Sequence, residues 1–237
     1  SENGLGRMPD TSFIIMPLAA AIFGALLTTM GRLPGTCIGA MQHFVVGAIC
    51  AVIALLTFPH AFFEGRVAAI LIGTAAGCAA SFLYEFLSAK IDPKFEIVLA
   101  ATLKFSVYGP ALRLVSVLDK GAAFGFLVAV TIDCLFTATD ILRASRSRRE
   151  ATWRTRGSAA LPVLSIAGFL LSRPLEMIDP DIGNGLVSFF MLLLLFLSFR
   201  SLIEDAFQRN DRPALCLLFV AGFAMIVFIE DLPVLHH

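Results

Sequence analysis

The feature that most constrains this chain is a series of apolar runs, each about as long as a membrane-crossing helix. A helix must supply roughly 20 mostly apolar residues to cross the hydrocarbon core of a bilayer. The run MQHFVVGAICAVIALLTFPHAF, residues 41–62, contains no Asp, Glu, Lys or Arg. Because comparable runs recur along the chain, we predict an all-α, polytopic transmembrane helix bundle.

Seven such runs predict seven spans. They lie near residues 12–30, 38–58, 67–87, 121–142, 158–178, 185–203 and 213–231. A polar segment, residues 1–11, precedes a single transmembrane domain, residues 12–237. Because the chain begins at Ser1 rather than Met, we expect that a methionine or a targeting peptide was removed.

The segment 95–118 is ambiguous. It is apolar overall but carries Lys104, Arg113 and a Gly109-Pro110 pair. Since a charge at the centre of a bilayer is costly, we favour an interfacial or re-entrant piece over a further span.

The distribution of positive charge favours counting 95–118 as an eighth span. Loops on the cytoplasmic side of a membrane carry an excess of Lys and Arg. An eighth span at 95–118 would place the arginine-rich segment 143–156 on the same side as Lys90 and Lys94. The number of spans is therefore left open at seven or eight.

The composition agrees with a membrane protein. Apolar residues make up 58% of the 237 residues and charged residues 15%, whereas soluble domains are about 45–50% apolar and about 25% charged. We expect an integral protein of a bacterial inner membrane or an organelle membrane, with lipids around it. The formal net charge of zero gives no support for a nucleic-acid partner.

Polar side chains inside predicted spans carry the functional information, because each must be paired or must line a wet cavity. Asp133 and Asp140 are seven residues apart and share a helix face with Thr137 between them. Carboxylate and hydroxyl oxygens suit hard cations, and carboxylates also bind zinc. Asp133 and Thr137 are thus candidate metal ligands, while pairing with nearby arginines is the favoured explanation for Asp140.

Three further residues are candidate metal ligands at the ends of spans. His43 lies near the start of run 38–58, His60 just after its end, and Glu230 at the end of run 213–231. For each histidine a hydrogen bond to a neighbour is the favoured explanation, and for Glu230 the alternative is a helix exit. Nothing in the sequence argues for an enzyme, because it has no nucleotide-binding loop, catalytic triad or H-E-x-x-H motif.

One span also carries small residues at helical spacing. Gly73 and Gly77 are four residues apart, the pattern that lets two helices approach closely. This predicts helix packing, within the chain or with a partner.

Four short stretches, in order, resemble bacterial-type ZIP metal transporters. QHFVVG at 42–47 resembles their "QHFAAG", and AAILIG at 68–73 resembles "AxxIGFxxG". FLVAVTID at 126–133 resembles "LLVAVxVDxxIDG", and FIEDLP at 228–233 resembles "LxxEELLxEAHE". The resemblance implies a ZIP-like fold, zinc or a similar divalent metal as cargo, and a metal-ligand position at Asp133.

The sequence departs from the family where metal ligands are expected. Leu56 stands where the family has a glutamate, His60 where an acid follows proline, and Thr137 where a second acid is expected. Residues 161–168, LPVLSIAG, supply no ligand at all. A binuclear site needs several carboxylate or imidazole ligands from two helices, so we expect a degenerate site.

Two functions follow from this pattern. The favoured one is a ZIP-like accessory or scaffolding subunit of a larger membrane complex, with other membrane-protein subunits, lipids or pigments as contacts. The alternative is a divalent-metal permease that moves zinc or a similar ion with Asp133 and a reduced ligand set.

Overall fold

The computed structural model of the chain describes residues 35–63, 67–91, 93–118, 120–143, 161–209 and 213–230, together with positions 15, 16 and 19. Every regular element in these ranges is helical, which confirms the predicted all-α fold. The span predicted near 12–30 lies outside the described residues, apart from those three positions.

Six long helices form the bundle. They are α2 (Gly35–Phe63), α3 (Val67–Ser88), α4 (Pro93–Leu118), α5 (Lys120–Arg143), α7 (Pro180–Arg209) and α8 (Pro213–Glu230). A shorter helical stretch, Leu161–Leu171, and a 3-10 turn, η1 (Arg173–Met177), lie between α5 and α7. Proline opens three of the long helices, at the position where its missing N–H leaves no intrahelical bond unmade.

The ambiguous segment 95–118 is one continuous helix, because α4 runs through Gly109-Pro110 without a break. Its stretch Val98–Val117 is long and apolar enough to cross a membrane, as are Val67–Ser88 and Pro180–Arg200. Other helices contain shorter apolar stretches among their described residues, and the total number of spans stays a prediction.

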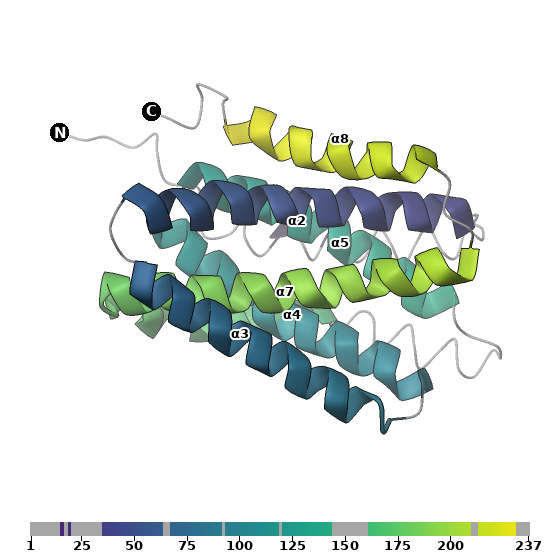
Figure 1. Cartoon of the computed structure of the whole chain (residues 1–237), viewed down its shortest axis with the longest axis horizontal. Helices are drawn as coiled ribbons and strands as arrows, with labels where there is room; N and C mark the ends of the chain where they lie inside the picture. Colours follow the sequence, from purple (N-terminus) through teal and green to yellow (C-terminus); the bar gives the residue numbers. More distant parts are fainter. Residues whose placement is uncertain are drawn as a thin grey trace.

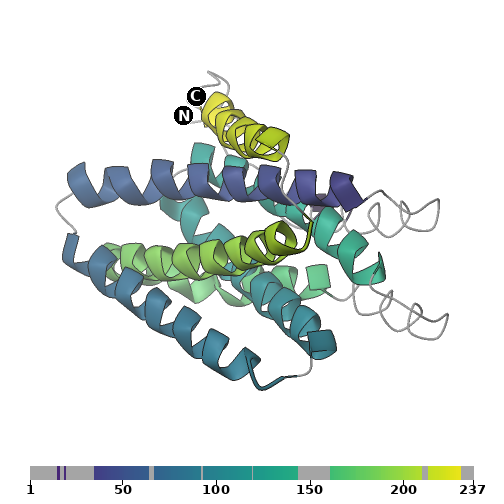
Figure 2. The ribbon, with the colours of Figure 1, turned by 45° about the vertical axis from the view of Figure 1, so that its right-hand side comes forward.

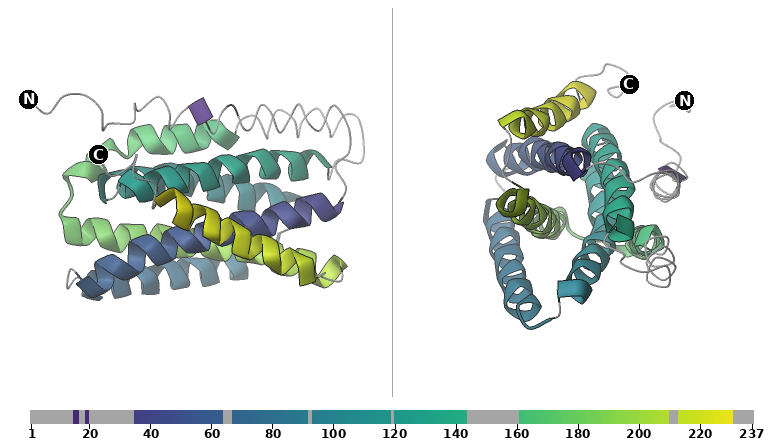
Figure 3. Two further views of the ribbon diagram at one scale, coloured as in Figure 1. Left: turned by 90° about the horizontal axis from the view of Figure 1, so that it is seen from above. Right: turned by 90° about the vertical axis from the view of Figure 1, so that its right-hand side faces the viewer.

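The long helices lie in two layers. Viewed end-on, α8, α2, α7 and α3 form one row, and α5 and α4 form a second row beside it (Figure 3). In the first row α2 packs against α8 and α7, and α7 packs against α3. In the second row α5 and α4 pack against each other, and they also pack against α2 and α7 respectively. The largest fully buried side chains, Tyr108, Phe105 and Phe126, belong to α4 and α5.

Glycines set the distance between helices within the first row. A Cβ atom on Gly47 of α2 would lie 2.0 Å from the carbonyl oxygen of Phe219 in α8. A Cβ atom on Gly73 of α3 would lie 1.9 Å from the carbonyl oxygen of Gly185 in α7. The α2–α8 and α3–α7 pairs therefore approach backbone to backbone. The small residues of α3 pack within the chain, one of the two alternatives that the sequence allowed.

The bundle has an approximate two-fold arrangement. A half-turn in the plane of Figure 1 exchanges α8 with α3, α2 with α7, and α5 with α4. The contacts follow the same exchange, since α2–α8 corresponds to α7–α3 and α2–α5 to α7–α4. Helices α2 and α8 run in one direction and their counterparts α7 and α3 run in the other (Figure 1). The two halves are therefore inverted relative to each other.

The outward face of α3 is strongly apolar. This helix lies at the edge of the first row, away from α8 (Figure 2). Large exposed side chains cover it, among them Leu71, Ile72, Phe82 and Phe86, and Phe82 is 81% exposed. A contiguous apolar face of this kind suits a lipid environment better than water.

Candidate functional site

The polar centre of the bundle forms where α4 crosses α5. Asp133 lies in α5, and Lys104 and Tyr108 lie in α4. Because Lys104 and Tyr108 are four residues apart, they project from the same face of α4. That face packs against the side of α5 from which Asp133 projects, so the three side chains meet between the helices.

Both oxygens of the Asp133 carboxylate have a donor from α4. The Lys104 ammonium lies 2.8 Å from Oδ1, and the Tyr108 hydroxyl donates a hydrogen bond of 2.6 Å to Oδ2. The Lys104 Nζ atom also lies 5.9 Å from the centre of the Tyr108 ring, within range of a cation–π contact. Asp133 is therefore compensated in charge and hydrogen-bonded at both oxygens.

The surroundings of the triad are tightly packed. The side chains of Lys104 and Asp133 are 11% and 8% exposed, and Tyr108 is fully buried. The Tyr108 ring packs edge-on against Phe105 and Phe126, with centroids 5.8 and 6.1 Å away. The packing of these rings fixes the Tyr108 side chain, so its hydroxyl group is preorganised to donate to Asp133 in α5.

A buried ion pair of this kind is sensitive to the loss of one partner. Removing one member of such a pair typically costs about 3–5 kcal/mol, because a charge remains buried without compensation. Replacing both members by residues of similar volume is often neutral. The Lys104–Asp133 pair is therefore evidence that α4 and α5 pack in one specific register, and it is weak evidence for high stability of the fold.

Two other candidate ligands, Thr137 and His43, lie within the described residues. Thr137 is one helical turn after Asp133 on α5 and is partly exposed. His43 is buried in α2, and its Nδ1 lies 2.8 Å from the carbonyl oxygen of Gly39. Because a carbonyl only accepts, Nδ1 must carry the proton. This is the neighbour hydrogen bond that the sequence allowed as the alternative to metal binding.

The side chains of three further candidates, His60, Glu230 and Asp140, lie outside the described residues. His60 belongs to α2, and Glu230 is the last residue of α8. Across the part of the chain that the structure describes, no three His, Cys, Asp or Glu side chains gather closely enough to hold a metal ion.

Sequence reasoning found Asp133 but missed Lys104 and Tyr108. A usable signal was present, because Lys104 and Asp133 are opposite charges within two apolar segments, and charges in a membrane pair with one another. Tyr108 had no such signal. Its position one turn after Lys104 becomes informative only when α4 is known to be an unbroken helix.

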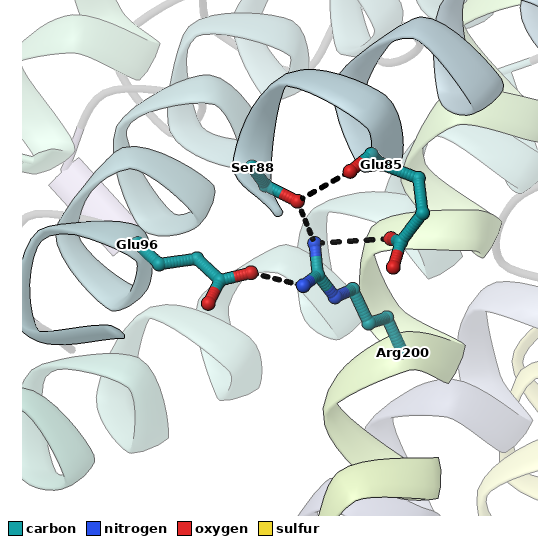
Figure 4. A network of polar contacts seen from close by, with 4 residues as sticks. All are labelled: Glu85, Ser88, Glu96 and Arg200. Atoms are coloured by element: carbon teal, nitrogen blue, oxygen red, sulfur yellow. Dashed lines mark hydrogen bonds and ion pairs between the residues drawn. The ribbon is translucent and has the colours of Figure 1, made fainter. Parts of the chain in front are cut away.

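A second polar cluster joins three helices near one end of the bundle. Arg200 of α7 reaches between α3 and α4 (Figure 4). Its Nη1 donates to the Ser88 hydroxyl at 3.0 Å and lies 3.2 Å from the Glu85 carboxylate, while its Nη2 binds the Glu96 carboxylate. The guanidinium also lies 5.3 Å from the centre of the Tyr84 ring. This cluster ties the α3–α4 hairpin to α7.

The two carboxylates of this cluster differ in exposure. The Glu96 side chain is 21% exposed and that of Glu85 is 54% exposed. Since exposed ion pairs contribute little, the Arg200–Glu96 contact is the stronger constraint. Glu85, near the end of α3, is the more exposed partner of Arg200.

Comparison with known proteins leaves the family open. No protein-family model matches the sequence. No curated protein matches it significantly either. The ZIP resemblance therefore stays a prediction, and the arrangement of Asp133, Lys104 and Tyr108 has to be interpreted on its own chemistry.

Proposed function

We propose that this chain is an integral membrane protein on a transporter-like frame that does not carry divalent metal and serves as an accessory or scaffolding subunit. One observation carries the proposal: Lys104 and Tyr108 take up both oxygens of Asp133. The ammonium of Lys104 occupies the place that a bound cation would take beside this carboxylate.

The donor set supports the same conclusion. Zinc in proteins is held by three or four Cys, His or carboxylate ligands. Asp133 supplies one carboxylate, and its nearest donors are an ammonium, which has no lone pair, and a phenol. A divalent ion at this position would have to displace Lys104 and, among the side chains that the structure describes, would meet the negative charge of Asp133 alone.

A metal permease is the second candidate function, and the inverted arrangement of the helices supports it. Many transporters consist of inverted halves, and their substrate sites lie at the interface between the halves. Here α4 and α5 exchange under the half-turn and pack against each other (Figure 1), and the Lys104–Asp133 pair joins them. Under this alternative, Lys104 leaves Asp133 during the cycle and zinc or a similar ion binds in its place.

Uptake of zinc into vesicles separates the two functions. Purified protein is reconstituted into liposomes beside an Asp133→Asn variant, which keeps the size of the side chain and an acceptor for Tyr108. We expect equal background uptake from both. Uptake by the wild type that disappears in Asp133→Asn would support the permease and refute the proposal.

The scaffolding role has its own test. Purification in a gentle detergent should recover further membrane-protein subunits in fixed stoichiometry, and pigment or lipid bound to them would be identified in the same preparation. A solitary monomer or homodimer that remains stable through several gentle detergents would contradict the scaffolding role. The test of metal transport is independent of this one, so the loss of the scaffolding role would not by itself support a permease.

A further inference from the structure

Contacts near the helix ends show which ends of the bundle lie together. Arg200, late in α7, binds Glu85 near the end of α3 and Glu96 in the first turn of α4. Asp133 lies ten residues before the end of α5, and Lys104 lies eleven residues after the start of α4. Helices α3, α5 and α7 therefore end where α4 begins.

Helices α2 and α8 begin at this same end. A Cβ atom on Gly222 of α8 would lie 2.0 Å from the carbonyl oxygen of Phe44 in α2. Phe44 lies nine residues after the start of α2 and Gly222 lies at the middle of α8, and Figure 1 shows that the two helices run in the same direction. The right-hand side of Figure 1 shows all of these ends together.

The described residues at this end include Lys90 and Lys94 around the turn between α3 and α4, Arg143 at the end of α5 and Arg209 at the end of α7. In the sequence, five further arginines follow Arg143 up to residue 156, and Arg212 follows Arg209. We call this end the cation-rich end. The connections at the opposite end contain Arg66, Lys120 and Arg173, and these stand beside the acids Glu64, Asp119, Glu176, Asp179 and Asp181.

We propose that the cation-rich end faces the side of the membrane from which the chain is inserted, the cytoplasm in a bacterial inner membrane. Lys and Arg in short loops set the orientation of polytopic proteins, because they stay on that side. The leaflet there also carries anionic lipid headgroups, which attract basic segments close to the membrane. In this orientation the turn between α3 and α4 is cytoplasmic, and η1 faces the opposite compartment.

Two exposed positions report the orientation directly. Lys90 lies in the turn at the cation-rich end, and Met177, which is 93% exposed, lies in η1 at the other end. A short epitope is inserted after either residue of the full chain, and antibody binding is measured on bacterial spheroplasts before and after permeabilisation. Lys90→Cys and Met177→Cys, probed with a membrane-impermeant maleimide, give the same readout with a smaller change.

We expect the epitope after Met177 to be detected on intact spheroplasts and the epitope after Lys90 only after permeabilisation, with at least a tenfold difference between them. The reverse pattern would overturn the orientation. Detection of both before permeabilisation, or of neither until it, would also overturn it, because the two ends would then not lie on opposite sides.

Discussion

Replacing Lys104 by methionine tests the internal ion pair most informatively. Methionine keeps the length of the side chain but removes the ammonium that lies 2.8 Å from Asp133. Since the Asp133 side chain is only 8% exposed, its charge would remain buried with the Tyr108 hydrogen bond alone. Breaking such a pair typically costs about 3–5 kcal/mol, which for a chain of this size lowers the midpoint of thermal unfolding by about 6–20 °C.

The assay is thermal unfolding in mild detergent, followed by helical circular dichroism. Lys90→Met is the matched control, because Lys90 is exposed and surface substitutions typically change stability by about 0.5 kcal/mol or less. The double variant Lys104→Met, Asp133→Asn should recover most of the loss, since it leaves no unpaired charge. If Lys104→Met unfolds at the same temperature as Lys90→Met, or if the double variant is the least stable of the three, the reasoning is wrong.

Three further perturbations follow from the geometry, each measured by the same unfolding assay. Tyr108→Phe removes the hydrogen bond to Asp133 and should cost about 1.5–3 kcal/mol, the usual range for a bond to a charged group; an unchanged midpoint would argue that the hydroxyl does not hold Asp133. Gly47→Ala should destabilise by about 1–3 kcal/mol, because its Cβ would lie 2.0 Å from the Phe219 carbonyl oxygen. Gly183→Ala, which meets nothing within 4 Å, should instead be neutral or slightly stabilising, and equal losses at the two glycines would contradict the close α2–α8 contact. Glu96→Gln should lower the midpoint more than Glu85→Gln, because Glu96 is the less exposed partner of Arg200; the opposite order would show that the cluster is held mainly through α3.

The helices were predictable from the sequence because length and apolar composition determine them. Runs such as 67–87 and 213–231 correspond to α3 and α8 within a residue or so at each end. In segment 95–118 the Gly109-Pro110 pair resembles a helix break, yet α4 continues through it, while the choice between an interfacial piece and a span stays a prediction. In the structure Gly109 provides room instead, since a Cβ atom there would lie 2.2 Å from the Ser165 carbonyl oxygen. A glycine that permits close packing and a glycine that ends a helix look identical in one sequence.

The candidate site was predictable only in part, for a similar reason. A carboxylate inside an apolar run is conspicuous, so Asp133 could be identified without a structure. Its partners depend on how two helices cross, and a sequence read alone does not give that register. The hydrogen bond of His43 is a contrasting case, because its partner Gly39 is only four residues away. Four residues is about one helical turn, so this bond can be expected from the sequence alone.

Anomalous X-ray diffraction at the zinc absorption edge, from crystals grown with zinc, tests the central claim most directly. That claim is that Lys104 and Tyr108 occupy both oxygens of Asp133, so that no divalent ion binds it. We expect no anomalous peak beside Asp133 and a Lys104 ammonium still within hydrogen-bonding distance of its carboxylate. A zinc peak bonded to Asp133, with Lys104 turned away, would contradict the account.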